Sequence, residues 1–107
     1  MDRLASLLDF LRDDPDDAFT RFALAQEYAK RGDSDAALQY YEGLVADQPS
    51  YVGTYYHLGK LYEALDRSDE AEATYRAGME VAQKEGDLHA RAELQSALLE
   101  AEGLGFD

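Results

Sequence analysis

The fold is decided by residues 24–49, LAQEYAKRGDSDAALQYYEGLVADQP, because their pattern returns 34 positions later in residues 58–83, LGKLYEALDRSDEAEATYRAGMEVAQ. A helix pair that recurs with this period is typical of a solenoid, in which each unit buries its apolar face against its neighbours. The aligned pairs are Leu24 and Leu58, Ala25 and Gly59, Tyr28 and Tyr62, Ser34 and Ser68, Ala37 and Ala71, Tyr41 and Tyr75, and, outside the quoted stretch, Pro15 and Pro49.

Composition and turn residues predict an all-α chain. Ala and Leu dominate the 107 residues, Ile is absent, and Val occurs only at positions 45, 52 and 81, which leaves little β-branched material for strands. Turn-forming residues divide the chain into six segments, and each segment is one helix long. The breaks fall at residues 14–17, 32–35, 48–50, 66–69 and 86–87.

Three of these breaks carry specific signals for helix starts or ends. Pro15 suits the first position of a helix, with Asp14 as its N-cap, so a helix is expected to begin there. Gly32 suits the left-handed conformation that ends a helix. Asp66 stands at the equivalent place in the next unit, where Asp is a tolerated substitute.

At these positions the sequence resembles the tetratricopeptide repeat family, whose 34-residue pattern places aromatic, small and proline residues at fixed offsets. The resemblance covers residues 18–85 and departs from the family pattern at Arg21, Ser34, Ser68 and Gln83. It implies a right-handed α–α superhelix of about six antiparallel helices in a single domain. The implied parts are an N-terminal half-repeat helix over residues 1–14, repeats over 18–51 and 52–85, and a C-terminal capping helix over 86–102.

The repeated tyrosines are expected in the core and are not expected to act as catalytic phenols. Ala25 and Gly59 mark places where two helices approach closely, and Ala37 and Ala71 are expected to face them from the second helix of each pair. The aromatic rings expected to fill the surrounding volume are those of Tyr28, Tyr41, Tyr62 and Tyr75.

Charge excludes one class of partner. With 10 Lys and Arg against 23 Asp and Glu, the formal charge is -13, and the basic residues are scattered, so no nucleic acid partner is expected. The acidic excess is read in two ways, as a generic solvated surface or as adaptation to high salt, where self-repulsion is screened. Neither a secretory signal nor an apolar span of membrane length is present, so a cytoplasmic protein without membrane insertion is expected.

The residues of a catalytic or metal centre are scarce. The chain lacks Cys, and His57 and His89 lie 32 residues apart, in neither a His-x-x-x-His nor a Glu-x-x-His spacing. The acidic clusters at residues 13–17 and 69–72 fall in the first turns of expected helices, where the helix dipole explains them. We therefore expect neither an enzyme nor a cofactor, and a metal-assisted hydrolase built on the two His is the weakest alternative.

The resemblance implies that the first helix of each pair lines a concave groove that binds a protein or peptide segment. The groove could hold apolar anchors against Phe22 and Tyr56, while Lys30 and Lys60 pair with an acidic group. The Lys and Asn clamp that some family members use on chaperone peptides is missing, and the third unit offers Ala90 and Leu94 at the groove positions. The candidate groove residues are Phe19, Phe22, Gln26, Lys30, Tyr56, Lys60 and Glu63.

Two alternatives to the groove stay open at this point. Phe19 and Phe22 could instead pack under the N-terminal helix against its leucines, which are Leu7, Leu8 and Leu11. The protein could also be a self-associating structural subunit, because the terminal helix holds more leucine than a solvated cap requires. The apolar residues of this homo-oligomer hypothesis are Leu88, Leu94, Leu98, Leu99 and Phe106.

Overall fold

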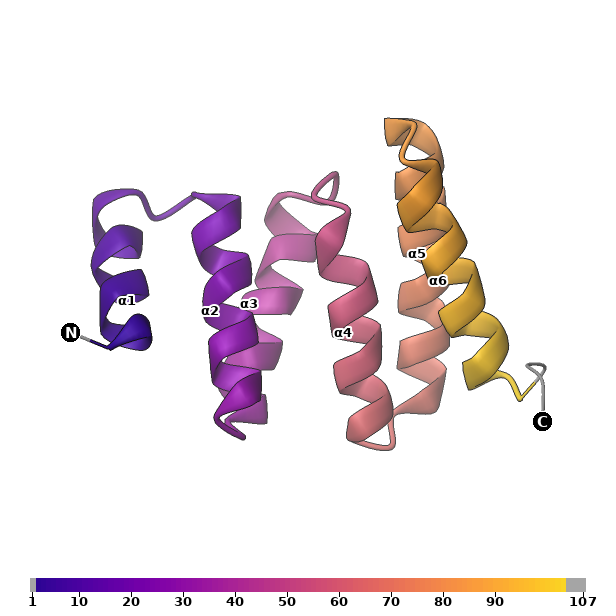
Figure 1. The fold of residues 1–107 in the computed structure, drawn as a ribbon, viewed down its shortest axis with the longest axis horizontal. Coiled ribbons are helices and arrows are strands. Elements are labelled where there is room, and N and C mark those ends of the chain that lie inside the picture. The colour runs from indigo at the N-terminus through magenta and orange to yellow at the C-terminus, as the bar shows by residue number, and fades with distance from the viewer. Residues whose placement is uncertain (1, 104–107) are drawn as a thin grey trace. The chain divides into compact units, whose positions relative to one another are not determined.

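The computed structural model describes residues 2–103, and within that range it forms six α-helices and no strand (Figure 1). The predicted all-α chain of six helices is therefore confirmed. Phe106, which the self-association hypothesis includes, lies outside the described residues. The helices are α1 (Arg3–Asp13), α2 (Ala18–Lys30), α3 (Ser34–Asp47), α4 (Gly53–Ala64), α5 (Ser68–Glu85) and α6 (Leu88–Ala101).

The chain divides into two compact units, residues 1–51 and residues 52–107. In the first unit α2 packs against both α1 and α3. In the second unit α5 packs against both α4 and α6, and α6 also contacts α4. Each unit is therefore a three-helix arrangement in which a central helix carries most of the contacts.

The start of α2 differs from the prediction. Asp17, and not Asp14, is the N-cap, and the helix begins at Ala18, three residues beyond the start expected at Pro15. One carboxylate oxygen of Asp17 accepts hydrogen bonds from the Thr20 backbone N–H at 2.9 Å and from its hydroxyl at 2.6 Å. These two bonds favour Asp17 over Asp14 as the N-cap, because an Asp side chain at that position accepts hydrogen bonds from the free N–H groups of the first helical turn.

The two turns that close α2 and α4 are built alike, as predicted. Gly32 has φ +84° and Asp66 has φ +59°, so both adopt the left-handed conformation. In each turn the next residue donates its N–H back into the helix, from Asp33 to the Tyr28 carbonyl at 2.9 Å and from Arg67 to the Tyr62 carbonyl at 2.8 Å. Because Asp reaches left-handed φ at moderate cost, the same turn forms with and without Gly.

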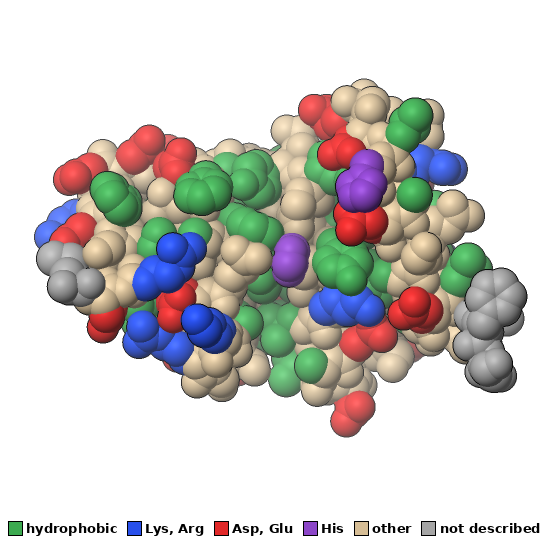
Figure 2. Space-filling view, in the orientation of Figure 1, with side chains coloured by type: hydrophobic (Ala, Val, Ile, Leu, Met, Phe, Trp, Pro, Cys, Tyr) green, Lys and Arg blue, Asp and Glu red, His purple; other side chains and the backbone are tan. Residues whose placement is uncertain are grey.

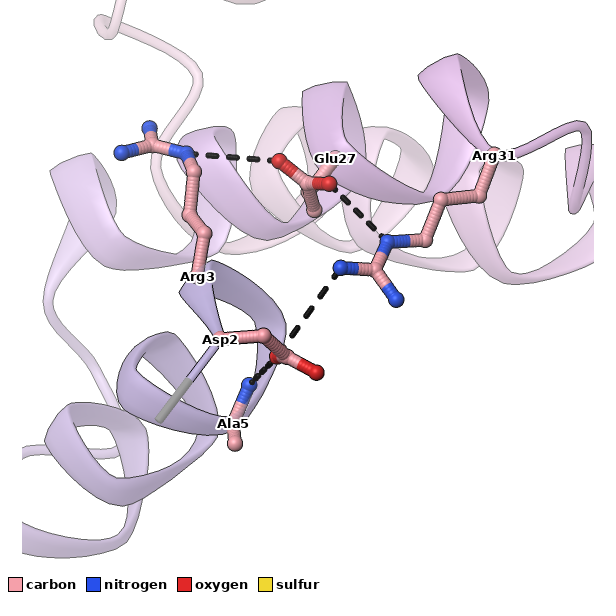
Figure 3. Close-up of polar contacts among 5 residues, drawn as sticks. All are labelled: Asp2, Arg3, Ala5, Glu27 and Arg31. Atoms are coloured by element: carbon pink, nitrogen blue, oxygen red, sulfur yellow. Dashed lines mark hydrogen bonds and ion pairs between the residues drawn. The ribbon is translucent and has the colours of Figure 1, made fainter.

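The core of the first unit joins α1 to α2. Leu7, Ala23 and Leu24 are buried together, and partly buried residues surround them, namely Leu4, Leu8, Leu11, Tyr28 and Tyr40. A cluster of ion pairs links α1 to the C-terminal end of α2, next to the N-terminal end of α1 (Figure 3). There the carboxylate of Glu27, whose side chain is 8% exposed, lies 2.9 Å from Nε of Arg31 and 3.4 Å from Nε of Arg3.

The core of the second unit is organised by two glycines. A Cβ on Gly59 would meet the Tyr75 ring, and a Cβ on Gly78 would meet Tyr55 and Leu94. The side chain that lies over Gly59 is therefore Tyr75, although the sequence had pointed to Ala71. The tyrosine prediction is confirmed for the three that are buried, Tyr41, Tyr62 and Tyr75, while Tyr28 is half-buried and stacks on Tyr40.

Candidate functional site

Four of the predicted groove residues lie along α2 in the first unit. Phe19 is 64% exposed, Gln26 and Lys30 are exposed, and Phe22 is half-buried. The ring of Phe22 lies 6.1 Å from that of Tyr41 and 5.7 Å from that of Tyr51. Phe22 therefore packs toward α3 and its C-terminal turn, and the exposure of Phe19 contradicts the alternative that it packs beneath α1.

The other three predicted residues come together on one face of α4 in the second unit. Tyr56, Lys60 and Glu63 follow the i, i+4, i+7 spacing that places side chains on one side of a helix. The ammonium of Lys60 lies 5.6 Å from the centre of the Tyr56 ring and 3.7 Å from the Glu63 carboxylate. Lys60 therefore already has an aromatic and an anionic neighbour within its own helix.

A pocket of about 190 Å³ joins this face of α4 to α6. Sequence reasoning missed its α6 wall, although residues 93, 96, 97 and 100 have the i, i+3, i+4, i+7 spacing of one helix face. In Figure 2, basic, hydrophobic and acidic side chains meet on the surface formed by these helices. The lining residues are Tyr56, Lys60, Glu93, Ser96, Ala97 and Glu100.

The residues that the sequence placed at the groove positions of the third unit, Ala90 and Leu94, do not line this pocket. Leu94 is 1% exposed and packs against Gly78, while Glu93 and Ala97 line the pocket. The 34-residue shift does not carry into the last helix because α5 has 18 residues, whereas the equivalent α3 has 14. Helix α6 begins at Leu88, 35 residues after the start of α4 at Gly53, so counting 34 residues from the repeat misplaces the faces of α6.

Hydrogen bonding and burial set the electrostatics around the pocket. The hydroxyl of Tyr75 donates a hydrogen bond to Glu63, and burial together with this bond raises the pKa of the Tyr75 phenol. His57 is half-buried beside the Tyr56 ring, and burial lowers the pKa of its imidazole despite the nearby negative charge of Glu93. Both side chains are thus held in their neutral forms near pH 7.

The pocket itself carries more negative than positive charge. Glu93 and Glu100 on α6 face one cation, Lys60, which is also close to Glu63. An aromatic ring with carboxylates around it suits a cationic or apolar group of a ligand, because cations bind over the ring face and pair with the acids. The pocket thus combines an aromatic ring, one cation and two carboxylates.

The leucines of the self-association hypothesis divide into two groups. Leu94 is in the core, which removes it from any surface, whereas Leu88 is 67% exposed and Leu99 is 40% exposed. Leu98 is half-buried. Within residues 2–103 no group of three His, Asp or Glu side chains is placed to hold a metal ion. In the same range no helix combines the length and apolar character needed to cross a bilayer.

Comparison with known proteins identifies the repeats. The tetratricopeptide repeat family model matches residues 28–98. A solution structure of a tetratricopeptide repeat domain protein from Salinibacter ruber is 56% identical, with a TM-score of 0.82 over 88% of this chain and 95% of that chain. A crystal structure of such a protein from the same organism is 57% identical, with a TM-score of 0.78 over 83% of this chain and 100% of that chain.

A more distant relative has the same architecture. The solution structure of a protein from Bordetella parapertussis is 26% identical, with a TM-score of 0.81 over 95% of this chain and 89% of that chain. No curated protein matches the chain. The fold is thus the all-α solenoid of these repeat proteins, which confirms the fold class predicted from the 34-residue period.

Proposed function

Because the chain belongs to the tetratricopeptide repeat family, whose fold is generally a protein–protein interaction module, we propose that it binds a segment of another protein without catalysing a reaction. The observation that carries the proposal is the pocket between α4 and α6. Tyr56 provides an aromatic contact there, and aromatic side chains dominate the energetics of protein interfaces. Ser96 and the carboxylates provide the polar surroundings.

The charges of the pocket favour a bound segment with a Lys or Arg side chain next to an apolar one. The cation would pair with Glu93 and Glu100 and approach the Tyr56 ring, where Lys60 now lies. This ligand differs in sign from the acidic group that Lys60 was expected to bind. Lys60 is the weaker candidate for such pairing because its ammonium already lies near Glu63.

The exposed surface of α2 is a second candidate contact in the same proposal. Phe19, Gln26 and Lys30 are open to solvent along one helix face, and Phe22 is half-buried beside them. An extended segment contacting this surface would use Phe19 as its apolar anchor, since an exposed aromatic ring gains most from burial.

Selection of peptides from an unbiased display library tests the proposal. The expected result is enrichment of sequences with Lys or Arg beside an apolar residue, followed by direct binding of a labelled peptide in fluorescence anisotropy. Tyr56→Ala and the double change Glu93→Gln, Glu100→Gln should each weaken binding about tenfold or more, as hot-spot truncations do. Failure to enrich any sequence would contradict the proposal, and enrichment of acidic sequences would contradict the stated ligand charge.

A matched control isolates the pocket. Glu85→Gln removes one carboxylate from the exposed end of α5, outside the pocket. Like the double change at Glu93 and Glu100, it makes the net charge less negative. Binding should be retained in this variant, and circular dichroism should show that all the variants keep their helices. Equal weakening by Glu85→Gln and the pocket variants would indicate a nonspecific effect of net charge.

Self-association is a second candidate function. The specific observation in its favour is the exposure of Leu88 and Leu99 on α6, which a fully solvated terminal helix does not require. Dimerisation or chain formation by the protein would cover these side chains. Sedimentation of the purified protein over a range of concentrations tests it directly.

A further inference from the structure

A second hollow, separate from the α4–α6 pocket, lies between α5 and α6. We call it the C-terminal groove; it measures about 500 Å³, and its apolar contacts come from Met79 on α5 and Leu98 on α6. It uses a different side of α6, because Arg91 and Leu98 line it, whereas Glu93 and Ala97 line the other pocket. The two sites can therefore be altered independently.

The C-terminal groove gathers positive charge in a strongly acidic protein. Arg76, Lys84 and Arg91 line it, against a single acid, Glu80. Arg76 is paired with Glu102 at 2.6 Å. Lys84 and Arg91 form no ion pair with another residue of the described range 2–103, so their charges are available to an acidic partner. Such a partner would join an apolar side chain to neighbouring carboxylates.

Helix α1 of a second copy has this combination. Phe10 is 62% exposed, and Asp13 and Asp14 follow it at the exposed end of the helix. The spacing of three and four residues places Phe10 and these acids on adjoining parts of one helix surface. Leu7 and the neighbouring leucines of α1 pack in the core with α2, whereas Phe10 stays exposed beside them.

The repeat relates Phe10 to a buried residue. A shift of 34 residues places α1 on α3, Phe10 on Leu44 and Pro15 on Pro49. The two helices also end alike, because Asp14 and Gln48 have φ values of -140° and -138° and each donates its N–H to the carbonyl four residues earlier. Leu44 is 0% exposed on α3, whereas the equivalent Phe10 is exposed on α1.

The two surfaces are complementary in charge. Asp13 and Asp14 follow the exposed Phe10 on α1, whereas Lys84 and Arg91 line the C-terminal groove together with Leu98.

We propose that the protein associates head to tail, with Phe10 of one copy entering the C-terminal groove of the next copy between Met79 and Leu98. Asp13 and Asp14 pair with Lys84 and Arg91 across this contact. The inference rests on the second candidate function, self-association, and assigns to it a contact made by Phe10, Met79 and Leu98, which lies apart from the exposed Leu88 and Leu99. We call the Phe10 surface the head and the C-terminal groove the tail. Because these surfaces differ, the contact is heterologous, and a pair of copies retains one free head and one free tail to which further copies can add.

Sedimentation equilibrium with two blocked variants tests the inference. Phe10→Asp blocks the head, and Leu98→Glu blocks the tail; Lys84→Glu, at an exposed position, is a second tail variant in case Leu98→Glu perturbs folding. The wild type should form species larger than a dimer between about 1 μM and 1 mM, the range in which modest interfaces associate. Each variant alone should remain monomeric, with an unchanged circular dichroism spectrum.

An equimolar mixture of head and tail variants provides the decisive result. One intact head and one intact tail remain in the mixture, so association should resume and stop at a dimer. Association of the wild type that Phe10→Asp leaves unchanged would overturn the assigned surfaces while leaving self-association as a function. A wild type that stays monomeric throughout the range would overturn both.

Discussion

The ring of Tyr75 on α5 lies directly against the backbone of Gly59 on α4, and the three atoms nearest to a Cβ built on residue 59 all belong to that ring. Tyr75 is completely buried and Gly59 is buried with it. The Tyr75 hydroxyl extends past Gly59 and donates a hydrogen bond to the carboxylate of Glu63, one turn further along α4. Because residue 59 has no side chain, the Tyr75 ring can pack against the α4 backbone in the core of the second unit.

Gly59→Ala should destabilise the protein, although Ala normally favours a helix. The added Cβ would displace the Tyr75 ring, and overpacking of this kind costs about 1–3 kcal/mol of unfolding free energy. Urea unfolding monitored by circular dichroism measures the change. Gly43→Ala is the matched control, because its Cβ would meet only the flexible end of the Arg21 side chain, with Nη2 at 2.8 Å. A stability loss equal to that of the control would contradict the close-packing account.

The same contact shows why the fold could be predicted from the sequence. A small residue on the first helix and a tyrosine on the second recur together at Ala25 with Tyr41 and at Gly59 with Tyr75. Tyr41 and Tyr75 are both buried. Packing constraints of this kind repeat with the structural unit, so an internal comparison of the chain reveals them without any knowledge of coordinates.

The candidate site was less predictable because its parts do not follow the repeat. Tyr56 and Lys60 were found from the positions of the repeat, but Glu93 and Glu100 lie on α6, whose register depends on how far α5 extends. Gly86, with φ +73°, ends α5 after 18 residues. The length of a single helix thus decides which face of α6 lines the pocket, and a 34-residue count does not reveal it.

Two threonines related by the repeat should respond in opposite ways to replacement by valine. Thr20 and Thr54 are both buried, but the Thr20 hydroxyl donates to Asp17 at 2.6 Å, whereas the Thr54 hydroxyl has no hydrogen-bond partner within residues 2–103. Thr20→Val should cost about 1 kcal/mol because a hydrogen bond to a carboxylate is lost. Thr54→Val should leave the protein equally or more stable because a buried unsatisfied hydroxyl disappears.

Thermal unfolding of the two variants beside the wild type measures this difference. Valine has nearly the shape of threonine, and both positions lie in the first turn of a helix, so differences in helix propensity cancel between them. A lower midpoint for Thr54→Val than for Thr20→Val would show that the hydroxyl of Thr54 has a stabilising role.

Glu27→Gln should loosen α1 from α2. The buried carboxylate of Glu27 accepts from Arg31 and lies close to Arg3 on α1, while Asp2 caps α1 and lies 3.8 Å from Arg31 (Figure 3). Loss of the charge should cost roughly 1–2 kcal/mol, since the arginines are partly exposed and return to water. Hydrogen exchange should show faster exchange of the α1 amides than in the wild type.

An exposed ion pair serves as the control for Glu27. Glu70 accepts two hydrogen bonds from Arg67 on the surface of the second unit, and its side chain is 49% exposed. Exposed pairs contribute little because water screens them, so Glu70→Gln should change stability much less than Glu27→Gln. Unchanged α1 exchange in Glu27→Gln would contradict the role assigned to the buried carboxylate.

Protonation of His57 should make the protein less stable as the pH falls below neutrality. Burial lowers the pKa of His57 in the folded chain, so between its folded and unfolded values the unfolded chain binds the extra proton. The unfolding free energy should therefore be constant above about pH 7.5 and should decrease as the pH falls from there to about pH 5.5. This window lies above the pH at which Asp and Glu titrate, so their protonation does not contribute to the change. His57→Gln should flatten this slope, whereas His89→Gln, whose side chain is 87% exposed, should leave it in place. Urea unfolding at each pH measures the slope, and a wild type as stable at the acid end as at neutrality would contradict a half-buried His57 that is neutral in the folded protein.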